Sequence, residues 1–351
     1  MTGGPTTADR STLADALARL PRVPLAVLPT PLERAPRLGQ AIGLPTLRVK
    51  RDDLTGLALG GNKARQLEYL LGEARSKSAT AVITGAGVES NHCRQLAAAC
   101  AKLGLRACLL LRGERPAQPE GNLLLGELCG AECRYIPGDR FYLDFAAEAQ
   151  AWAAELRSAG EVPYLVDTLG WDSHSLGVAA LGYVHAALEL EEQFSRENWR
   201  PDAVYLCSGA ATQAGLLVAK HAMGLSYEIV GISASPFIPD KQSVIANVAK
   251  RAATLLGIEV AIGPSDVTNL SEYIGTGYGL PTPASREALR LAARTEGLLL
   301  DPTYTSKALA GLIDRRRRGL MDAAASALFL HTGGAPNLFL ARNADLGAGL
   351  A

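Results

Sequence analysis

The stretch that decides the fold is residues 202–233, DAVYLCSGAATQAGLLVAKHAMGLSYEIVGIS. It has four successive parts: an apolar run at Asp202–Cys207, a loop of small residues at Ser208–Thr212, a helical pattern at Gln213–Met223 and a second apolar run at Glu228–Ser233. A short buried run, a helix and another buried run are typical of a right-handed β-α-β unit. This stretch therefore predicts two neighbouring parallel strands joined by a helix.

The same order of elements occurs earlier in the chain. There the parts are an apolar run at Thr80–Thr84, a small-residue loop at Gly85–Ser90, a helical pattern at Asn91–Leu103 and an apolar run at Arg106–Leu111. Ala327–Leu330 predicts a late strand that ends in the glycine turn His331–Gly334. The repeated order predicts an α/β fold with a largely parallel sheet. The polar segment Glu189–Arg200 is either the end of a helix or a hinge between two sheets.

The composition argues against several classes of protein. Among the 351 residues, 35 Lys plus Arg balance 35 Asp plus Glu, so there is no net positive field for a nucleic acid or a membrane surface. No run approaches the ~18 apolar residues of a membrane span. The six cysteines are spread through apolar stretches, which favours free thiols in the cytoplasm. Cys129 and Cys133 would share a face if residues 123–133 were helical, but no third ligand lies nearby, so we expect no metal.

Three loops next to predicted helix starts are chemically unusual. The first, Ser208–Thr212, has side chains small enough for its backbone N–H groups to approach a ligand, and a loop between strand and helix suits a phosphate. The second, Gly60–Lys63, places a lysine at a helix start, where the helix dipole and lost hydration disfavour its charged form. A neutral amine is what a Schiff-base lysine requires. The third, Glu89–His92, brings a hydroxyl, an amide and an imidazole together.

Each loop also has a simpler explanation. Ser208–Thr212 could be a packing turn, Lys63 an exposed residue in the first turn of a helix, and Ser90 or Asn91 a helix cap. In parallel sheets, ligands bind beyond the carboxyl ends of the strands, where all three loops are expected to lie. Their joint occurrence therefore favours one shared site.

In this order, the loops resemble those of pyridoxal-phosphate enzymes of the tryptophan-synthase-β type. The resemblance is to the group that contains 1-aminocyclopropane-1-carboxylate (ACC) deaminase and D-cysteine desulfhydrase. The matching segments are Pro29–Leu32, Lys50–Gly56, Gly60–Lys63, Ser90–His92, Leu300–Tyr304 and His331–Gly334, and the match covers about nine-tenths of the chain.

The resemblance implies an overall architecture. The fold would be α/β, fold type II of the pyridoxal-phosphate enzymes, with two intertwined three-layer domains and mainly parallel twisted sheets. Residues 1–22 would form an N-terminal tail and short helix, residues 23–66 with 178–351 a large cofactor-binding domain, and residues 67–177 a small domain. The habit of the group is a homodimer or a larger assembly, and we expect a homodimer in the cytoplasm.

The resemblance also implies a role for each site residue. Lys63 would bind pyridoxal 5'-phosphate as a Schiff base and then move protons. Asn91 would bind the ring hydroxyl of the cofactor, and Ser90 the substrate carboxylate, with His92 as a further possible substrate contact. Tyr304 would position the substrate or transfer protons. The remaining cofactor contacts would be the phosphate loop, Ser208, Gly209, Ala210, Ala211 and Thr212, and two hydroxyls near the ring nitrogen, Thr305 and Thr332.

Two positions favour one reaction over another. ACC deaminases typically carry Glu after the active-site tyrosine and Leu before the Gly-Gly pair, whereas this chain has Thr305 and Thr332, as desulfhydrase-like members do. A neutral hydroxyl weakens the electron sink of the cofactor ring, which still suits loss of a good leaving group. We therefore expect α,β-elimination on a small β-substituted amino acid, giving pyruvate, ammonia and a leaving group such as sulfide.

Three departures from the family leave the substrate and its stereochemistry open. Glu89 replaces the usual Gln, Gln66 stands where a phosphate-binding Lys is common, and Gly170–His174 replaces the Gly-Gly-Ser-Asn stretch common near the substrate. One alternative is an ACC deaminase-like ring-opening enzyme, or a specialised enzyme for another amino acid such as L-cysteate. Another is a non-catalytic ligand-binding homologue.

Overall fold

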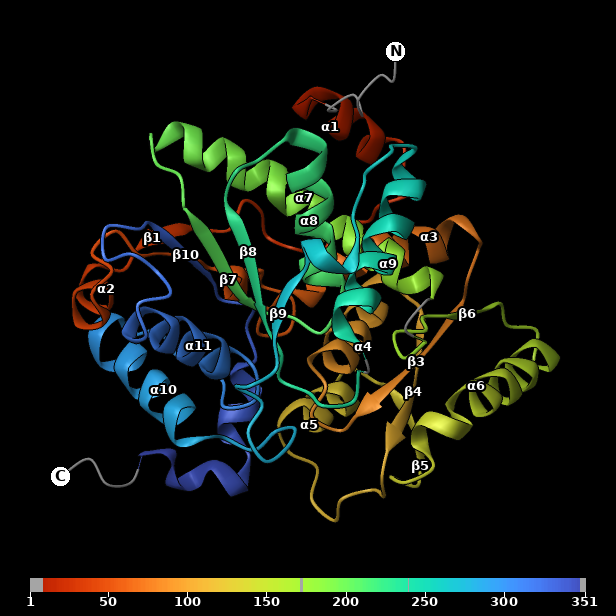
Figure 1. Ribbon diagram of the computed structural model, residues 1–351. Coiled ribbons are helices and arrows are strands. Elements are labelled where there is room, and N and C mark those ends of the chain that lie inside the picture. Colours follow the sequence, from red (N-terminus) through yellow and green to blue (C-terminus); the bar gives the residue numbers. More distant parts are fainter. Residues whose placement is uncertain (1–8, 171–172, 239, 348–351) are drawn as a thin grey trace.

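A computed structural model describes residues 9–170, 173–238 and 240–347. Within them the strands form two sheets (Figure 1). The larger sheet has the order β1-β2-β10-β7-β8-β9 and is parallel except for β1. Its strands are β1 (Leu32–Arg34), β2 (Arg48–Lys50), β7 (Ala203–Cys207), β8 (Glu228–Ile232), β9 (Thr268–Leu270) and β10 (Ala327–Leu330). The strand closest to the C-terminus, β10, therefore lies between β2 and β7 in the middle of the sheet.

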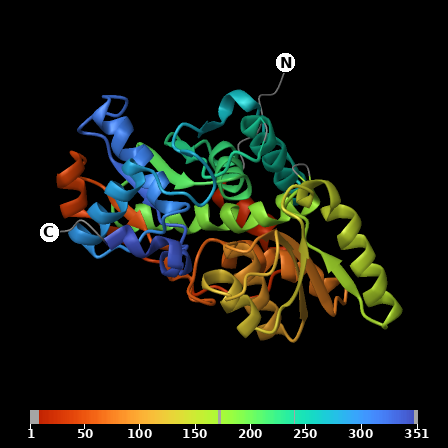
Figure 2. The same ribbon diagram turned by 90° about the horizontal axis from the view of Figure 1, so that it is seen from below.

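The smaller sheet is entirely parallel and has the order β5-β4-β3-β6. Its strands are β3 (Ala81–Gly87), β4 (Arg106–Arg112), β5 (Glu132–Ile136) and β6 (Pro163–Leu165). Helix α6 (Phe141–Ser158) packs on one face through Phe145 and Trp152, and α4 (Asn91–Leu103) packs on the other. Figure 2 shows these two helices on opposite sides of the sheet. Helix α5 (Gly121–Leu128) lies against α4.

Helices also cover both faces of the larger sheet. One face packs against α2 (Pro36–Ile42), α10 (Pro283–Glu296) and α11 (Thr305–Arg317). The other packs against α7 (His174–Arg196) and α8 (Ala211–Met223). Further elements on this side are α1 (Arg10–Ala18), α3 (Lys63–Ser76) and α9 (Lys241–Leu256). The prediction of an α/β fold with mainly parallel sheets is confirmed.

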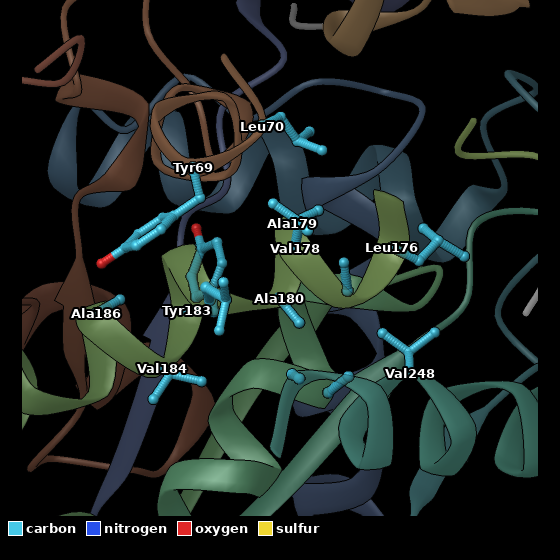
Figure 3. Packing of buried hydrophobic residues seen from close by; sticks show 14 of the residues in the cluster. Tyr69, Leu70, Leu176, Val178, Ala179, Ala180, Tyr183, Val184, Ala186 and Val248 are labelled. Carbon is cyan, nitrogen blue, oxygen red and sulfur yellow. The ribbon is translucent and has the colours of Figure 1, made fainter. Parts of the chain in front are cut away.

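One hydrophobic core is shared by the two sheets. It joins Val82 of β3 and Leu109 of β4 to Leu206 of β7, with α7 between them. Side chains of α7 such as Val178 and Tyr183 pack against α3 and α9 (Figure 3). Because both sheets pack on this core, they are held together by buried apolar contacts.

One local detail differs from the sequence prediction, and another decides between two predicted alternatives. Cys133 lies on β5 rather than on a helix with Cys129, because the helix ends at Leu128 and Gly130 takes a positive φ. Helix α1 is capped by Asp9, one residue before it begins. The polar segment Glu189–Arg200 contains the end of α7, as one of the two alternatives predicted.

The proposed domain boundaries at 66/67 and 177/178 fall inside α3 and α7, and the division into domains stays a prediction. Over the described ranges, no helix is long and apolar enough to cross a membrane. The same ranges contain no group of three metal-ligating side chains.

Candidate active site

The three predicted loops meet around one cavity of about 230 Å³. Helices α3, α4 and α8 point their N-termini at it from beyond the carboxyl ends of β2, β3 and β7. The sequence-predicted residues that line it are Lys63, Ser90, Asn91, His92, Ser208, Gly209, Ala210, Ala211, Thr212, Tyr304 and Thr332. Three N-terminal helix ends at one cavity create a positive potential suited to anionic groups.

A larger hollow of about 730 Å³ lies between α1, α3 and α7. Its charged rim is internally paired, with Arg10 and Arg196 both bonded to Glu192. Those side chains are therefore already engaged, whereas the smaller cavity gathers the reactive groups.

Lys63 is the first residue of α3, and its side chain faces the cavity. Burial lowers the pKa of its amine from 10.5 to about 8, and the nearby Cys207 thiol opposes this only in part. Nζ donates a hydrogen bond to Oε1 of Gln66 at 3.2 Å. Roughly a tenth of this amine is thus free base at pH 7, far more than for a solvated lysine, and covalent capture of an aldehyde requires the free base.

The N-terminus of α8 forms the opposite wall. The N-cap residue Ala210 has no side chain that could cap this helix, so the N–H groups of Ala211 and Thr212 are directed at the cavity without an intrahelical acceptor. Thr212 Oγ1 accepts from Asn62 Nδ2 and from Gln66 Nε2, each at 3.0 Å. Ser208 Oγ accepts from the backbone N–H of Gln213 at 3.1 Å. The loop is therefore rigid, and its unpaired N–H groups can bind a phosphate.

The N-terminus of α4 contributes an amide and a hydroxyl. Ser90 caps the helix by accepting from the N–H of Cys93 at 3.2 Å. Asn91 Oδ1 accepts from Asn122 Nδ2 at 3.1 Å, which leaves the amide nitrogen of Asn91 free to donate. His92 Nε2 lies 3.2 Å from Thr84 Oγ1, and burial, assisted by the Lys63 charge, lowers its pKa to about 3. His92 is therefore a neutral wall residue.

Tyr304 lies at the N-terminus of α11 and faces the same cavity. Its hydroxyl is hydrogen-bonded to that of Tyr278, and the two rings meet edge to face with centroids 5.8 Å apart. Burial raises the pKa of both phenols, so both stay protonated. The sequence reasoning missed Tyr278. The feature of the sequence that could have indicated it is the glycine-rich loop Gly275–Gly279 around Tyr278. In the structure Gly275 and Gly279 take positive φ.

The two threonines expected near a ring nitrogen have different surroundings. Thr332 lines the cavity. Thr305 Oγ1 donates to Asp301 Oδ1 at 2.7 Å and accepts from the N–H of Asp301 at 2.8 Å. It lies outside the set of described residues that line the cavity. Of these two threonines, Thr332 is thus the one that could contact a molecule bound in the cavity.

The departures from the family also have distinct positions. Gln66 is a wall residue between Lys63 and Thr212. Glu89 forms an ion pair with Arg342, so its charge is balanced at the rim. Trp171 and Asp172 lie outside the described residues.

Comparisons with known proteins agree with this arrangement. The model of the family described as "Pyridoxal-phosphate dependent enzyme" matches residues 23–333. A D-cysteine desulfhydrase of Yersinia enterocolitica is 38% identical over 334 residues, which cover 93% of this chain and 98% of that protein. A putative 1-aminocyclopropane-1-carboxylate deaminase of Pyrococcus abyssi is 37% identical over 324 residues, which cover 92% of this chain and 94% of that protein.

Solved structures of such enzymes are also similar to this chain. The crystal structure of an ACC deaminase homologue superposes with a TM-score of 0.83 at 37% identity, covering 93% of this chain and 96% of that one. A pyridoxal 5'-phosphate-dependent aspartate racemase superposes with a TM-score of 0.63 at 16% identity, covering 95% and 97%. The second likeness is one of fold alone.

Proposed function

Since the chain belongs to the family of pyridoxal-phosphate dependent enzymes, we propose that it is a lyase for a small β-substituted amino acid. Relatives 36% and 38% identical over most of the chain carry the name D-cysteine desulfhydrase, and we place this protein with them. The reaction breaks the Cα–H and Cβ–S bonds of a cysteine-like substrate and releases sulfide. Hydrolysis of the resulting 2-aminoacrylate gives pyruvate and ammonia.

The cavity residues fit the polar groups of pyridoxal 5'-phosphate. Lys63 would hold the aldehyde carbon, and the N–H groups of Gly209–Thr212 would hold the phosphate. Asn91, whose amide nitrogen is free to donate, would bind the ring hydroxyl, and Thr332 the ring nitrogen. The bound cofactor supplies an electron sink for the carbanion at the substrate's α-carbon.

The protein's own side chains would orient the substrate and move its protons. Ser90 and the N–H groups at the start of α4 would bind the substrate carboxylate, since they face the cavity at a positive helix end. Lys63, once released as a free amine, would take the α-proton at Nζ. Tyr304 would carry a proton at its hydroxyl, supported by its hydrogen bond with the Tyr278 hydroxyl.

One observation carries this proposal: a lysine amine with a pKa near 8 shares a small cavity with the N-terminus of α8. The test is to add pyridoxal 5'-phosphate to the purified protein and record its visible absorption. Wild type should gain the violet band of a lysine-bound cofactor and Lys63→Ala should not. A wild-type protein that stays colourless contradicts the proposal.

The second candidate is ring-opening deamination of 1-aminocyclopropane-1-carboxylate. It is supported by the structural likeness to an ACC deaminase homologue and by the similar Pyrococcus protein. The neutral Thr332 at the cavity favours elimination over ring opening, because a hydroxyl holds the ring nitrogen less firmly protonated than a carboxylate does.

A substrate panel separates the candidates. D-cysteine, L-cysteine, β-chloroalanine, L-cysteate and 1-aminocyclopropane-1-carboxylate would each be scored for keto acid and ammonia. Keto acid from D-cysteine supports the first candidate. Keto acid from the cyclopropane substrate alone supports the second, and binding without turnover over the whole panel supports a non-catalytic homologue.

We further propose a homodimer in the cytoplasm. The six free cysteines are compatible with a reducing compartment. Light scattering coupled to size exclusion measures the mass directly, and a value near 36.8 kDa would contradict the dimer.

A further inference from the structure

The carbonyl oxygen of Gly60 receives two hydrogen bonds from helix α4. Arg94 Nη2 donates to it at 2.7 Å, and Gln95 Nε2 donates at 3.0 Å. Gly60 lies three residues before Lys63, and α4 begins with the loop that contains Ser90 and Asn91. One carbonyl thus connects the lysine loop to the helix of the proposed substrate-carboxylate site.

The lysine loop is closely confined at this point. A Cβ at Gly60 would lie 1.9 Å from the carbonyl oxygen of Asp53, and one at Gly61 would lie 2.7 Å from Gln95 Nε2. A Cβ at Gly333 would lie 2.6 Å from Cα of Gly61. Gly60 and Gly61 also have φ values of +66° and +123°, which favour glycine. The backbone is therefore wedged between neighbours, and its position depends on them.

Burying the Arg94 side chain costs free energy. It is 0% exposed, and its Nε and Nη1 have no hydrogen-bond partner within the described structure. Burial lowers the pKa of the guanidinium to about 10, so it still carries a charge at neutral pH. No ion pair with a carboxylate is found for it among the described residues. By contrast Arg65, also buried, is paired with Asp52 and Glu189.

A buried charge without a counter-charge destabilises a fold, and replacing it with an apolar side chain of similar volume is often neutral or stabilising. Gln95 is also 0% exposed and leaves Oε1 without a partner. Two residues that each leave polar atoms unpaired both donate to the same carbonyl. The position of Arg94 and Gln95 is therefore better explained by the Gly60 carbonyl that they bind than by a contribution to the stability of the fold.

We propose that Arg94 and Gln95 are positioning residues: they clamp the Gly60 carbonyl and so fix Lys63 relative to Ser90 and Asn91. The inference rests on the proposed function, because it assumes that Lys63 binds the cofactor and moves the α-proton. A small displacement of the amine from its reacting atom can lower a rate about 100-fold, so a clamp at this point affects turnover directly.

The test compares four variants of the cofactor-loaded protein. Arg94→Met and Gln95→Met each remove one donor to Gly60, and Arg94→Lys keeps a single donor with a charge. The control is Arg48→Met, which removes another buried arginine, one that pairs with Glu197 and stacks on Trp199. The readouts are Tm, kcat and KM with the active amino acid of the panel, and visible circular dichroism of the bound cofactor.

We expect Arg94→Met to keep or raise Tm, to lower kcat about 10- to 100-fold with a smaller change in KM, and to change the visible dichroism band. Gln95→Met should change kcat and the band in the same direction, and Arg94→Lys should recover part of the loss. Arg48→Met should lower Tm and leave kcat and the band unchanged, because it lies away from the cavity.

The clamp is refuted if both methionine variants keep the wild-type kcat and visible dichroism. It is also refuted if kcat falls only in the variants whose Tm falls, and by more where Tm falls further. A purely structural role would give that result. If Arg94→Met does not fold, that also contradicts the expected stability, and Gln95→Met, a near-isosteric change, still tests the positioning. Failure of the proposed function is seen separately, as a wild-type protein without the visible band or turnover.

Discussion

Replacing Gln66 with Glu would test the chemistry of Lys63 most directly. Gln66 Oε1 accepts from Lys63 Nζ at 3.2 Å, so the change puts a carboxylate next to the amine with little change of shape. Burial lowers the pKa of Lys63 to about 8. A negative charge within about 4–6 Å favours the protonated amine and raises such a pKa by about 1–3 units.

The expected effect on reactivity follows from the neutral fraction of the amine. With a pKa of about 8, roughly a tenth of Lys63 is neutral at pH 7. A rise of about 1–3 units lowers that fraction by about 10- to 1000-fold. Because only the neutral amine attacks an aldehyde, the rate of cofactor capture at pH 7 should fall by the same factor.

The assay is stopped-flow absorbance of the cofactor-free protein mixed with pyridoxal 5'-phosphate over a range of pH. The rate should rise with pH, with a midpoint near 8 in wild type and at a higher pH in Gln66→Glu. Pyridoxal, which lacks the phosphate, separates this shift from charge repulsion at the phosphate loop. Gln66→Met controls for shape. A wild-type midpoint near that of a solvated lysine, ~10.4, or a midpoint that Gln66→Glu does not move would refute the reasoning.

Three further changes give distinct outcomes. Tyr304→Phe should lower kcat by about 100- to 10,000-fold in initial-rate assays, because it removes the hydroxyl proposed to carry a proton, while near-wild-type kcat would exclude that role. Thr212→Val leaves the buried amide donors of Asn62 and Gln66 without their acceptor. The free energy of unfolding in urea should therefore fall by about 1–3 kcal/mol for each donor, and an unchanged unfolding midpoint would contradict the geometry. Asp52→Asn removes one of the two carboxylates that pair with Arg65, and because Glu189 remains, the free energy of unfolding at pH 7 should fall by less than the about 3–5 kcal/mol expected for a fully broken buried pair. Burial raises the pKa of Asp52, but Arg65 outweighs it and the net pKa is lowered, so the stabilisation is present above about pH 4 and is lost as pH falls further. The difference in unfolding free energy between wild type and Asp52→Asn should therefore shrink in acid, and a constant difference would be inconsistent with the ion pair.

Much of the fold and of the cavity could be predicted from local sequence. The bounds of α4, Asn91–Leu103, follow from its apolar periodicity, its serine cap and the glycine that ends it. Short apolar runs before small-residue loops predict β7 within one residue and the start of β3, although β3 continues to Gly87, inside the predicted loop. The loops at their ends converge because parallel strands end at the same edge.

Other features depend on contacts that no local pattern contains. Tyr278 reaches the cavity because its hydroxyl meets that of Tyr304, 26 positions away in the sequence. Thr305 appears equivalent to Thr332 in the sequence, yet Asp301 engages its hydroxyl. The polar atoms left unpaired on Arg94 become visible only when burial and hydrogen bonds are known together. These are tertiary facts, set by which elements pack against each other.

The central place of β10 determines when the active site can form during synthesis. Residues 327–330 lie between β2 and β7, and the backbone N–H of Asn62 donates to the carbonyl of Thr332 at 3.0 Å. The loop of Lys63 therefore depends on a segment that is translated about 270 residues later. In a nascent chain, Lys63 is therefore made long before β10 and Thr332, which complete the cavity. Cofactor capture is thus expected only once residue 332 has left the ribosome.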